Sequence, residues 1–277
     1  MYSEIRYEVT EPAAIITLNR PAALNAWTNA MDGEIQDAMM RAQADRSVVG
    51  IIVTGAGRAF CAGADMNMLS SIAGGNREQA AAPERTATPD ANEHGEFTGR
   101  FPYLMTIDKP IIAAINGAVA GMAFPFALCC DIRVITPEAV MLTAFAQRGL
   151  IAEWGLSWLL PRLVGPGVAL DLLFSSRKVG GEEAVRIGLA NTLVSRDELI
   201  PYCVDYVTGL AERCSPTSLA IMKRQVYEQL HVGLGAAERH AQQLMIESFG
   251  RTDFAEGVKS FLEKRPPAFR RLPLPEG

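Results

Sequence analysis

The sequence predicts an α/β fold, with a parallel core followed by a helical C-terminal region. In the first part of the chain, short β-branched or apolar runs alternate with glycine turns and helical segments, which is typical of parallel α/β proteins. After about Val168 the pattern is helical throughout. We therefore expect an α/β core over residues 1–165 and a helical region over 166–277.

The N-terminal segments predict two strands, a helix and a third strand. Residues 4–10 and 13–19 are alternating or apolar runs around a proline, so they predict a pair of strands. Thr28 is expected to cap a helix that runs to about Ala44, with apolar residues on one face. Residues 48–54 are the kind of β-branched run that is buried in a parallel sheet.

The middle of the chain is irregular before order returns. Residues 66–95 are small, polar and rich in proline and glycine, which predicts a long loop that acts as a mobile lid or binding loop or is disordered. A helix is then expected over 96–107, a strand over 111–115, a small-residue buried helix over 121–130 and a strand over 132–136. Helices are expected at 168–175, 181–188, 197–213, 216–230, 235–249 and 252–263.

The bulk composition excludes several classes of function. The formal net charge is −5, which argues against a nucleic-acid partner because such proteins usually present a clustered basic face. The most apolar stretch, 110–130, is interrupted by Asn116, glycines and Pro125, so no membrane-spanning helix is expected. The N-terminal residues lack the pattern of a targeting peptide, and we expect a cytoplasmic protein.

The cysteines and histidines do not predict a metal site. The five cysteines form no CxxC pair, and none of the three histidines lies in an HExxH motif or near a cysteine pair. We therefore expect buried, reduced thiols and no bound metal.

A glycine-rich segment follows the strand over 48–54. Residues 55–65 could suggest a dinucleotide site, but Phe60 occupies the third glycine position of the G-x-G-x-x-G pattern. A phosphate-binding P-loop is also excluded, since no Gly-Lys-Ser/Thr follows. The segment is equally compatible with a tight turn that needs glycine dihedral angles.

A second segment, 109–125, runs from a strand through a turn into a helix. The first turn of this helix, Gly121-Met122-Ala123, leaves N–H groups that have no partner within the helix. Pro125 fits the first turn, where its missing N–H costs little. The alternative is that the small residues have only a structural role, which is to let a buried helix pack closely.

A third segment contains a lone carboxylate. Glu153 is the only acidic residue between Glu138 and Asp171, and Leu150, Ile151 and tryptophans surround it in the sequence. A carboxylate in apolar surroundings should have a raised pKa and act as a proton acceptor near neutral pH. The alternative is a helix N-cap or a surface charge beside a buried helix.

Together these segments resemble the enoyl-CoA hydratase/isomerase (crotonase) superfamily. The resemblance lies in four segments in the family's order: 16–26, 57–65, 109–121 with Cys130-Asp131, and 261–265. It implies a crotonase-like spiral core of ββα turns, with a helical C-terminal region used in trimer contacts. It also implies an acyl-CoA thioester as substrate, no cofactor, and a homotrimer or a dimer of trimers.

The resemblance further implies the positions of the binding site. The backbone N–H groups of Ala64 and Met122 would hold the thioester oxygen. The adenine end of coenzyme A would lie near Ala62, Ala64, Asp65 and Met66, with Ala23 and Leu24 along the pantetheine and phosphate path. Phe261 and Lys264 would complete the site, from the same or a neighbouring subunit.

The catalytic pattern departs from that of the family's hydratases, which use two glutamates to add water. Those positions hold Pro125 and Phe145, which cannot orient or deprotonate water. Glu153 instead falls where members that resemble Δ3,Δ2-enoyl-CoA isomerases carry a single catalytic glutamate. The main expectation is therefore double-bond isomerisation, with Glu153 moving a proton and an oxyanion hole holding the enolate.

Two alternatives remain open. The first is a hydratase or lyase that uses Glu153 in an unorthodox way. The second is a catalytically silent acyl-CoA-binding protein that kept the fold. An aryl-CoA dehalogenase is disfavoured, because it needs a histidine before Lys109, where the sequence has none after His94, and an aspartate where this chain has the longer Glu153. A doubly wound nucleotide-binding protein is disfavoured by the broken glycine pattern.

Overall fold

Two β-sheets form the centre of the computed structural model, which describes residues 2–76 and 97–273. The larger sheet has the order β1-β2-β3-β5-β7-β10 and the smaller one β4-β6-β8-β9. The pairs β1–β2 and β8–β9 are antiparallel, and all other pairs are parallel. The strands are β1 Ile5–Thr10, β2 Ala13–Leu18, β3 Gly50–Gly55, β4 Ala59–Cys61, β5 Ile111–Ile115, β6 Ala118–Ala120, β7 Ile132–Ile135, β8 Val140–Leu142, β9 Val179–Gly180 and β10 Thr192–Leu193.

The chain winds between the two sheets in repeated ββα units. The strand pairs β3–β4, β5–β6 and β7–β8 each place their first strand in the larger sheet and their second in the smaller sheet. The helices α2 (Met66–Ala73), α3 (Ala123–Cys129) and α4 (Leu156–Val164) follow these pairs in turn. This arrangement confirms the predicted spiral of ββα turns. Strands β3 and β5 are buried along their whole length, which explains their continuous apolar sequences.

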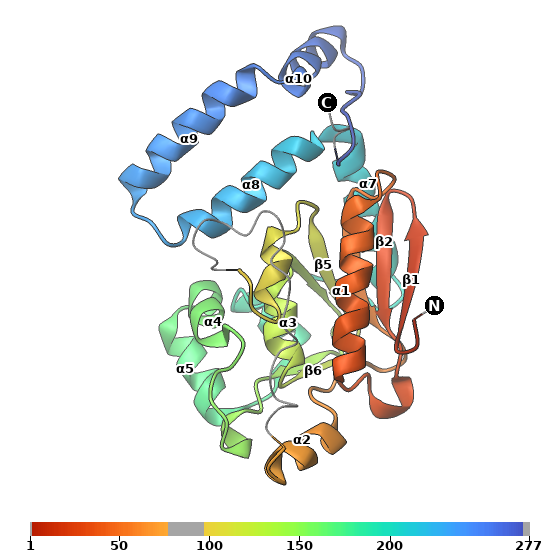
Figure 1. Ribbon diagram of the computed structural model, residues 1–277, viewed down its shortest axis with the longest axis vertical. Coiled ribbons are helices and arrows are strands. Elements are labelled where there is room, and N and C mark those ends of the chain that lie inside the picture. The colour runs from red at the N-terminus through yellow and green to blue at the C-terminus, as the bar shows by residue number, and fades with distance from the viewer. Residues whose placement is uncertain (1, 77–96, 274–277) are drawn as a thin grey trace.

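Helix α1 (Asn29–Ala44) begins where the sequence predicts. The Thr28 side chain accepts a hydrogen bond of 3.0 Å from the Met31 N–H, which satisfies one of the free donors at the helix start. Met31, Ile35, Ala38 and Met39 are buried, as the helical spacing predicts. Figure 1 shows this helix lying along strands β1 and β2.

Two expectations for the middle of the chain are wrong. Residues 66–73 form helix α2 instead of the start of a loop, because Asp65 caps it and apolar residues recur at helical spacing. The helix expected over 96–107 is only a short 3-10 turn, η3 (Pro102–Thr106). Tyr103, Leu104 and Met105 are all buried in succession, so this segment has no single apolar face. The rest of the expected loop, 77–95, and Glu96 lie outside the described residues.

The C-terminal part is mostly helical, although the short strands β9 and β10 lie in it and extend the two sheets. All six predicted helices are present within two residues of their expected ends. One of them, α7, packs its Leu199, Cys203 and Val207 against the larger sheet. Figure 1 shows α8 to α10 at the end of the molecule opposite α2. Over the described residues, no helix is both long and apolar enough to cross a membrane. The helices are α5 Pro166–Ser175, α6 Gly181–Arg186, α7 Leu199–Arg213, α8 Pro216–Gln229, α9 Leu234–Phe249 and α10 Thr252–Glu263.

Candidate active site

A cavity of about 660 Å³ opens between the loops that follow β4 and β6, helix α2 and the segment 144–154. Most of its wall is apolar. Two arginines and one glutamate supply the charged groups among the described lining residues. The lining consists of Ala23, Leu24, Ala26, Ala62, Gly63, Ala64, Met66, Met68, Leu69, Ile72, Arg100, Ala120, Gly121, Met122, Ala144, Phe145, Arg148, Leu150, Glu153 and Trp154.

Two glycines bring the loops after β4 and β6 into backbone contact. Gly63 and Gly121 both have positive φ, at +98° and +51°. A Cβ atom on Gly63 would lie 2.9 Å from the carbonyl oxygen of Ala120, closer than side chains normally come to backbone. A Cβ atom on Gly121 would lie 3.9 Å from the Gly63 Cα. The absence of a side chain at Gly63 therefore lets the two loops meet, whereas Gly121 is favoured by its positive φ and not by lack of space.

The residues that follow these glycines, Ala64 and Met122, both line the cavity. Trp27 bonds to the segment on both sides of Ala64: its N–H donates to the Gly63 oxygen at 2.7 Å, and its oxygen accepts from the Asp65 N–H at 2.9 Å. Within residues 2–76 and 97–273, the N–H groups of Ala64 and Met122 donate no hydrogen bond. Two N–H groups without a protein acceptor thus lie on adjoining loops beside the cavity.

The side chain of Asn25 anchors the glycine-rich segment over residues 55–65. Its fully buried side-chain amide donates to the carbonyl oxygens of Ala56 and Ala59, at 2.9 and 2.8 Å. Its side-chain oxygen accepts from the Arg20 N–H at 2.9 Å. The residue itself adopts φ +57°, which asparagine tolerates better than most residues. Asn25 therefore ties the turn after β2 to the turn before β4.

Glu153 lies on the cavity wall, as its predicted role requires. It does not cap α4, because Gly155 occupies the N-cap position of that helix. Burial raises the pKa of Glu153 above the ordinary value of a glutamate, and the indole of Trp154 acts in the opposite direction to a smaller extent. A carboxylate with a raised pKa can accept a proton and give it back near neutral pH.

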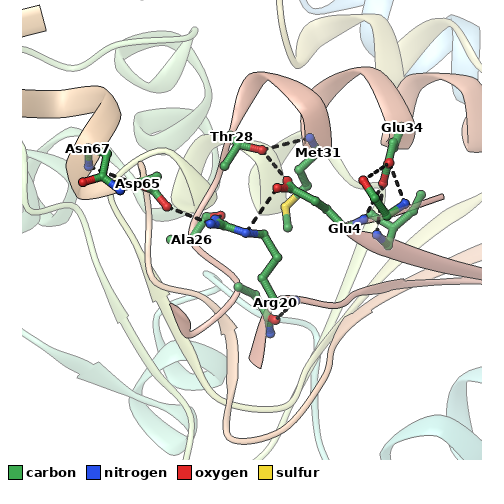
Figure 2. A network of polar contacts seen from close by, with 11 residues as sticks. Glu4, Arg20, Ala26, Thr28, Met31, Glu34, Asp65 and Asn67 are labelled. Atoms are coloured by element: carbon green, nitrogen blue, oxygen red, sulfur yellow. Dashed lines mark hydrogen bonds and ion pairs between the residues drawn. The ribbon is translucent and has the colours of Figure 1, made fainter. Parts of the chain in front are cut away.

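Four further predicted residues, Ala23, Leu24, Ala62 and Met66, also line the cavity. Asp65 is not among the described lining residues. Its side chain accepts from the Asn67 N–H at 2.9 Å, which caps α2, and it forms an ion pair with Arg20 at 3.0 Å. Figure 2 shows Arg20 between Asp65 and Glu4. Asp65 thus supports the cavity wall from behind.

Phe261 and Lys264 lie apart from the cavity. Both belong to the end of α10, where Lys264 is the C-cap residue, and Figure 1 places α10 at the opposite end of the molecule from α2. Phe261 is 82% exposed, which is unusual for a phenylalanine. Within one chain these two residues do not meet the other predicted site residues.

Sequence reasoning missed three features of the cavity. Leu69 and Ile72 on α2 line it beside Met66, and their spacing of three residues is a helical signal that was present in the sequence. Arg148 lines it and donates to the Ala144 oxygen at 3.0 Å. Arg100 lines it although it is only 2% exposed, and no sequence pattern marked this residue.

Pro125 and Phe145, which stand where the resemblance implies glutamates in hydratases, differ in their relation to the cavity. Phe145 is buried and lines it. Pro125 lies in the first turn of α3, where its missing N–H costs little, and it is not among the described lining residues. Of the described residues that line the cavity, Glu153 is the only carboxylate.

Among the described residues, the cysteines and the metal-binding side chains do not form a second centre. Four of the five cysteines are buried, Cys214 is half-buried, and none is in a disulfide. Burial raises the pKa of the Cys61 thiol to about 12, so this residue is a poor nucleophile. In the part of the chain that the structure describes, no three His, Cys, Asp or Glu residues gather as metal ligands would.

Known proteins resemble this chain over nearly its whole length. The family model described as enoyl-CoA hydratase/isomerase matches residues 8–271. A probable enoyl-CoA hydratase from Rhodobacter capsulatus is 34% identical over 97% of this chain and 98% of its own. A crotonyl-CoA hydratase from Syntrophomonas wolfei is 31% identical, with 97% of this chain and 98% of the relative covered.

Solved structures show the same fold. An enoyl-CoA hydratase from Polaromonas sp. JS666 aligns with a TM-score of 0.86 at 26% identity, over 96% of this chain and 99% of that chain. An enoyl-CoA hydratase from Bacillus anthracis aligns with a TM-score of 0.84 at 27% identity, over 97% and 99%. The sequence match, the ββα spiral and the cavity agree: this chain belongs to the enoyl-CoA hydratase/isomerase family.

Proposed function

We propose that this enzyme isomerises an enoyl-CoA, moving the double bond from C3–C4 to C2–C3. The observation that carries the proposal is the lone carboxylate, Glu153, among the described residues that line the cavity. Water addition by the family's usual route needs two carboxylates, whereas isomerisation needs one base that removes a proton and returns it elsewhere.

In the proposed reaction the carboxylate of Glu153 removes a proton from C2 of a 3-enoyl-CoA. The electrons of the C2–H bond move to the thioester oxygen, which the N–H groups of Ala64 and Met122 hold. The protonated Glu153 then gives the proton to C4. The electrons of the C3–C4 double bond form the new C4–H bond, those of the C1–C2 double bond of the enolate form the C2–C3 double bond, and the thioester carbonyl is restored. No atom is gained or lost, so the thioester is the only reactant and no cofactor takes part.

The environment of Glu153 supports this cycle. The same group must be ionised when it takes the proton and protonated when it returns it, so its pKa has to lie nearer neutrality than that of an exposed glutamate. Burial raises the pKa of Glu153 in this direction. The neighbouring Phe145 and Trp154 on the cavity wall limit access of water, which strengthens the hydrogen bonds to the enolate oxygen.

The comparisons favour a second candidate, a hydratase with an unusual acid–base set. The relatives from Rhodobacter capsulatus and Syntrophomonas wolfei are both named as hydratases. In that case Glu153 would have to act both on the attacking water and on the acyl group. Because Phe145 occupies one of the two usual glutamate positions on the cavity wall, we rank this candidate second.

An assay with two substrates separates the candidates. The protein is incubated with a 3-enoyl-CoA and, separately, with a 2-enoyl-CoA, and the absorbance of the conjugated thioester is followed. We expect absorbance to rise with the first substrate and to stay nearly constant with the second. Rapid loss of absorbance with the second substrate would favour the hydratase. Binding of both with turnover of neither would favour a silent acyl-CoA-binding protein.

We also propose a homotrimer or a dimer of trimers, assembled through the C-terminal helices. The support is the apolar surface there: Leu234, Ile246, Phe261 and Leu262 are each more than 60% exposed. In such an assembly Phe261 and Lys264 would reach the coenzyme A site of a neighbouring subunit. Light scattering should then give three or six times the chain mass of 30.0 kDa. A cytoplasmic location stays a prediction.

A further inference from the structure

Trp154, which directly follows Glu153, has an unusual backbone conformation. Its φ is +56°, in the left-handed region that bulky side chains rarely adopt. Gly155 follows with φ +79°, so the chain makes two left-handed steps between the carboxylate and helix α4. Such a conformation persists only where the surroundings hold it, and it is common at functional sites.

Two side chains from one neighbouring segment hold the Trp154 ring. The guanidinium carbon of Arg100 lies 4.9 Å from the ring centre, within the range of cation–π attraction. The ring of Phe101 meets it edge-on, with 6.1 Å between the ring centres. Arg100 is 2% exposed, and its contacts include the side-chain oxygen of Asn29 at 3.4 Å. The attraction between cation and ring is strengthened where water is excluded.

The indole N–H of Trp154 is a buried donor at the cavity wall. Its Nε1 atom is shielded from solvent and has no hydrogen-bond partner among the described residues. Buried donors in native proteins nearly always have a partner, so one without demands an explanation. The carboxylate of Glu153, the adjacent residue, lines the same cavity and is an acceptor for this donor. In the same sense, the indole lowers the pKa of Glu153 against the larger effect of burial.

We propose that Trp154 is a positioning residue for Glu153: clamped by Arg100 and Phe101, its indole N–H holds one carboxylate oxygen and leaves the other to move the proton. The catalytic part of this inference rests on the proposed function, whereas the contact itself does not. The indole already acts on the carboxylate in the ligand-free protein, and the hydrogen bond would shorten when a thioester fills the cavity, since such bonds are often long in an empty site. The left-handed backbone at Trp154 is what lets adjacent residues face the same cavity.

The proposal predicts a specific kinetic effect. The indole N–H of Trp154 favours the ionised form of the Glu153 carboxylate and fixes the orientation of that group. Removal of the N–H should therefore slow proton transfer and leave thioester binding nearly unchanged. Removal of the N–H should also shift the acidic limb of the pH–rate profile to higher pH. The pKa of Glu153 would rise, because the indole would no longer counteract the effect of burial.

The test compares two substitutions that keep an aromatic ring. Trp154→Phe removes the N–H, and Trp158→Phe does the same at a tryptophan that stacks on His231 and is not among the described cavity-lining residues. For Trp154→Phe we expect kcat on a 3-enoyl-CoA to fall about tenfold, the value of one charge-assisted bond, with KM within about twofold. Trp158→Phe should behave as wild type. A Trp154→Phe enzyme with wild-type kcat and pH profile would overturn the proposal.

The role of Arg100 is tested by two substitutions that differ in whether they keep its positive charge. Arg100→Lys keeps a cation that can lie over the ring, and Arg100→Met keeps only apolar bulk. We expect the methionine variant to show the same shift in pH profile as Trp154→Phe, and the lysine variant to recover most of the loss. Thermal melting of both variants identifies any loss of folding. Equal pH profiles for folded Arg100→Met and wild type would refute the clamp.

A readout without turnover separates this inference from the proposed function. The carboxyl band of Glu153 is followed by infrared titration, as the difference between each protein and its Glu153→Gln counterpart. Removal of the indole N–H should move this titration to higher pH even if no 3-enoyl-CoA is consumed. An unchanged titration midpoint in Trp154→Phe would reject the contact, whereas an inactive wild type with a shifted midpoint would reject only the isomerase proposal.

Discussion

Gly63 and Gly121 meet backbone to backbone at the cavity, and their contact sets the spacing of Ala64 and Met122, which follow them. A Cβ on Gly63 would lie 2.9 Å from the Ala120 oxygen, and one on Gly121 would lie 3.9 Å from the Gly63 Cα. The two loops come from consecutive ββα units, so neither loop alone could form the pair of donors. The pair of backbone donors therefore exists only because the spiral fold brings consecutive ββα units together.

Gly63→Ala should separate the two loops and weaken the grip on the thioester oxygen. We expect kcat to fall by roughly 10²–10³, the usual cost of losing one oxyanion donor. Gly165→Ala is the matched control, because Gly165 also has a positive φ, +78°, but a Cβ there meets nothing within 4 Å. Steady-state kinetics on a 3-enoyl-CoA checks the pair. Equal losses in both variants would show that backbone strain, and not loop spacing, causes the effect.

The pH dependence of turnover should report Glu153. The carboxylate must be ionised to accept the C2 proton, so kcat/KM should fall as the pH drops through its pKa. Because burial raises the pKa of Glu153, this acidic limb should lie above the range of an exposed glutamate. Rates measured between about pH 4 and 8 test this. A limb at the ordinary glutamate value would mean that the carboxylate is well solvated during the reaction.

Hydration of a 2-enoyl-CoA should be slow in the wild-type enzyme. Pro125 and Phe145 stand where the resemblance implies the two groups that orient and deprotonate water, and each such group is worth about 10²–10⁴ in rate. We expect hydration to be at least about 10² slower than isomerisation of the matching 3-enoyl-CoA. Product analysis by chromatography measures both rates, and comparable values would contradict the single-carboxylate mechanism.

Asn25→Ala should destabilise the fold. The substitution removes a buried side chain that makes three hydrogen bonds and places alanine at φ +57°. We expect a loss of roughly 2–4 kcal/mol in the free energy of unfolding, measured by denaturant titration. Asn67→Ala is the control, because its side chain is exposed and should change stability by less than about 0.5 kcal/mol. A small effect at Asn25 would mean that water replaces its bonds.

The sequence predicted the long elements because their signals are periodic. The buried strands β3 and β5, helix α1 and the six C-terminal helices all appear at or near their expected residues. The short strands of the smaller sheet were missed, since two or three residues carry no measurable alternation. The 3-10 turn η3 was expected as a helix because its apolar residues are dense enough to suggest one face.

The site could be predicted only where a motif or an unusual neighbourhood marked it. Ala64, Met122 and Glu153 line the cavity as expected, the first two from the family resemblance and the third also from its apolar neighbours. Asp65 was predicted to lie near the adenine end of coenzyme A, and in the structure its side chain caps α2 and forms an ion pair with Arg20. Arg100 could not be found in advance, because burial of a cation depends on long-range packing that no local pattern records.

Comparison of the wild type with Glu153→Gln tests the central claim most directly. The amide has the same shape but cannot accept a proton, so single-turnover rates on a 3-enoyl-CoA should fall by about 10²–10⁴. Binding of the thioester, measured by calorimetry, should stay within about threefold of wild type. A Glu153→Gln enzyme that still isomerises the substrate at the wild-type rate would contradict the account.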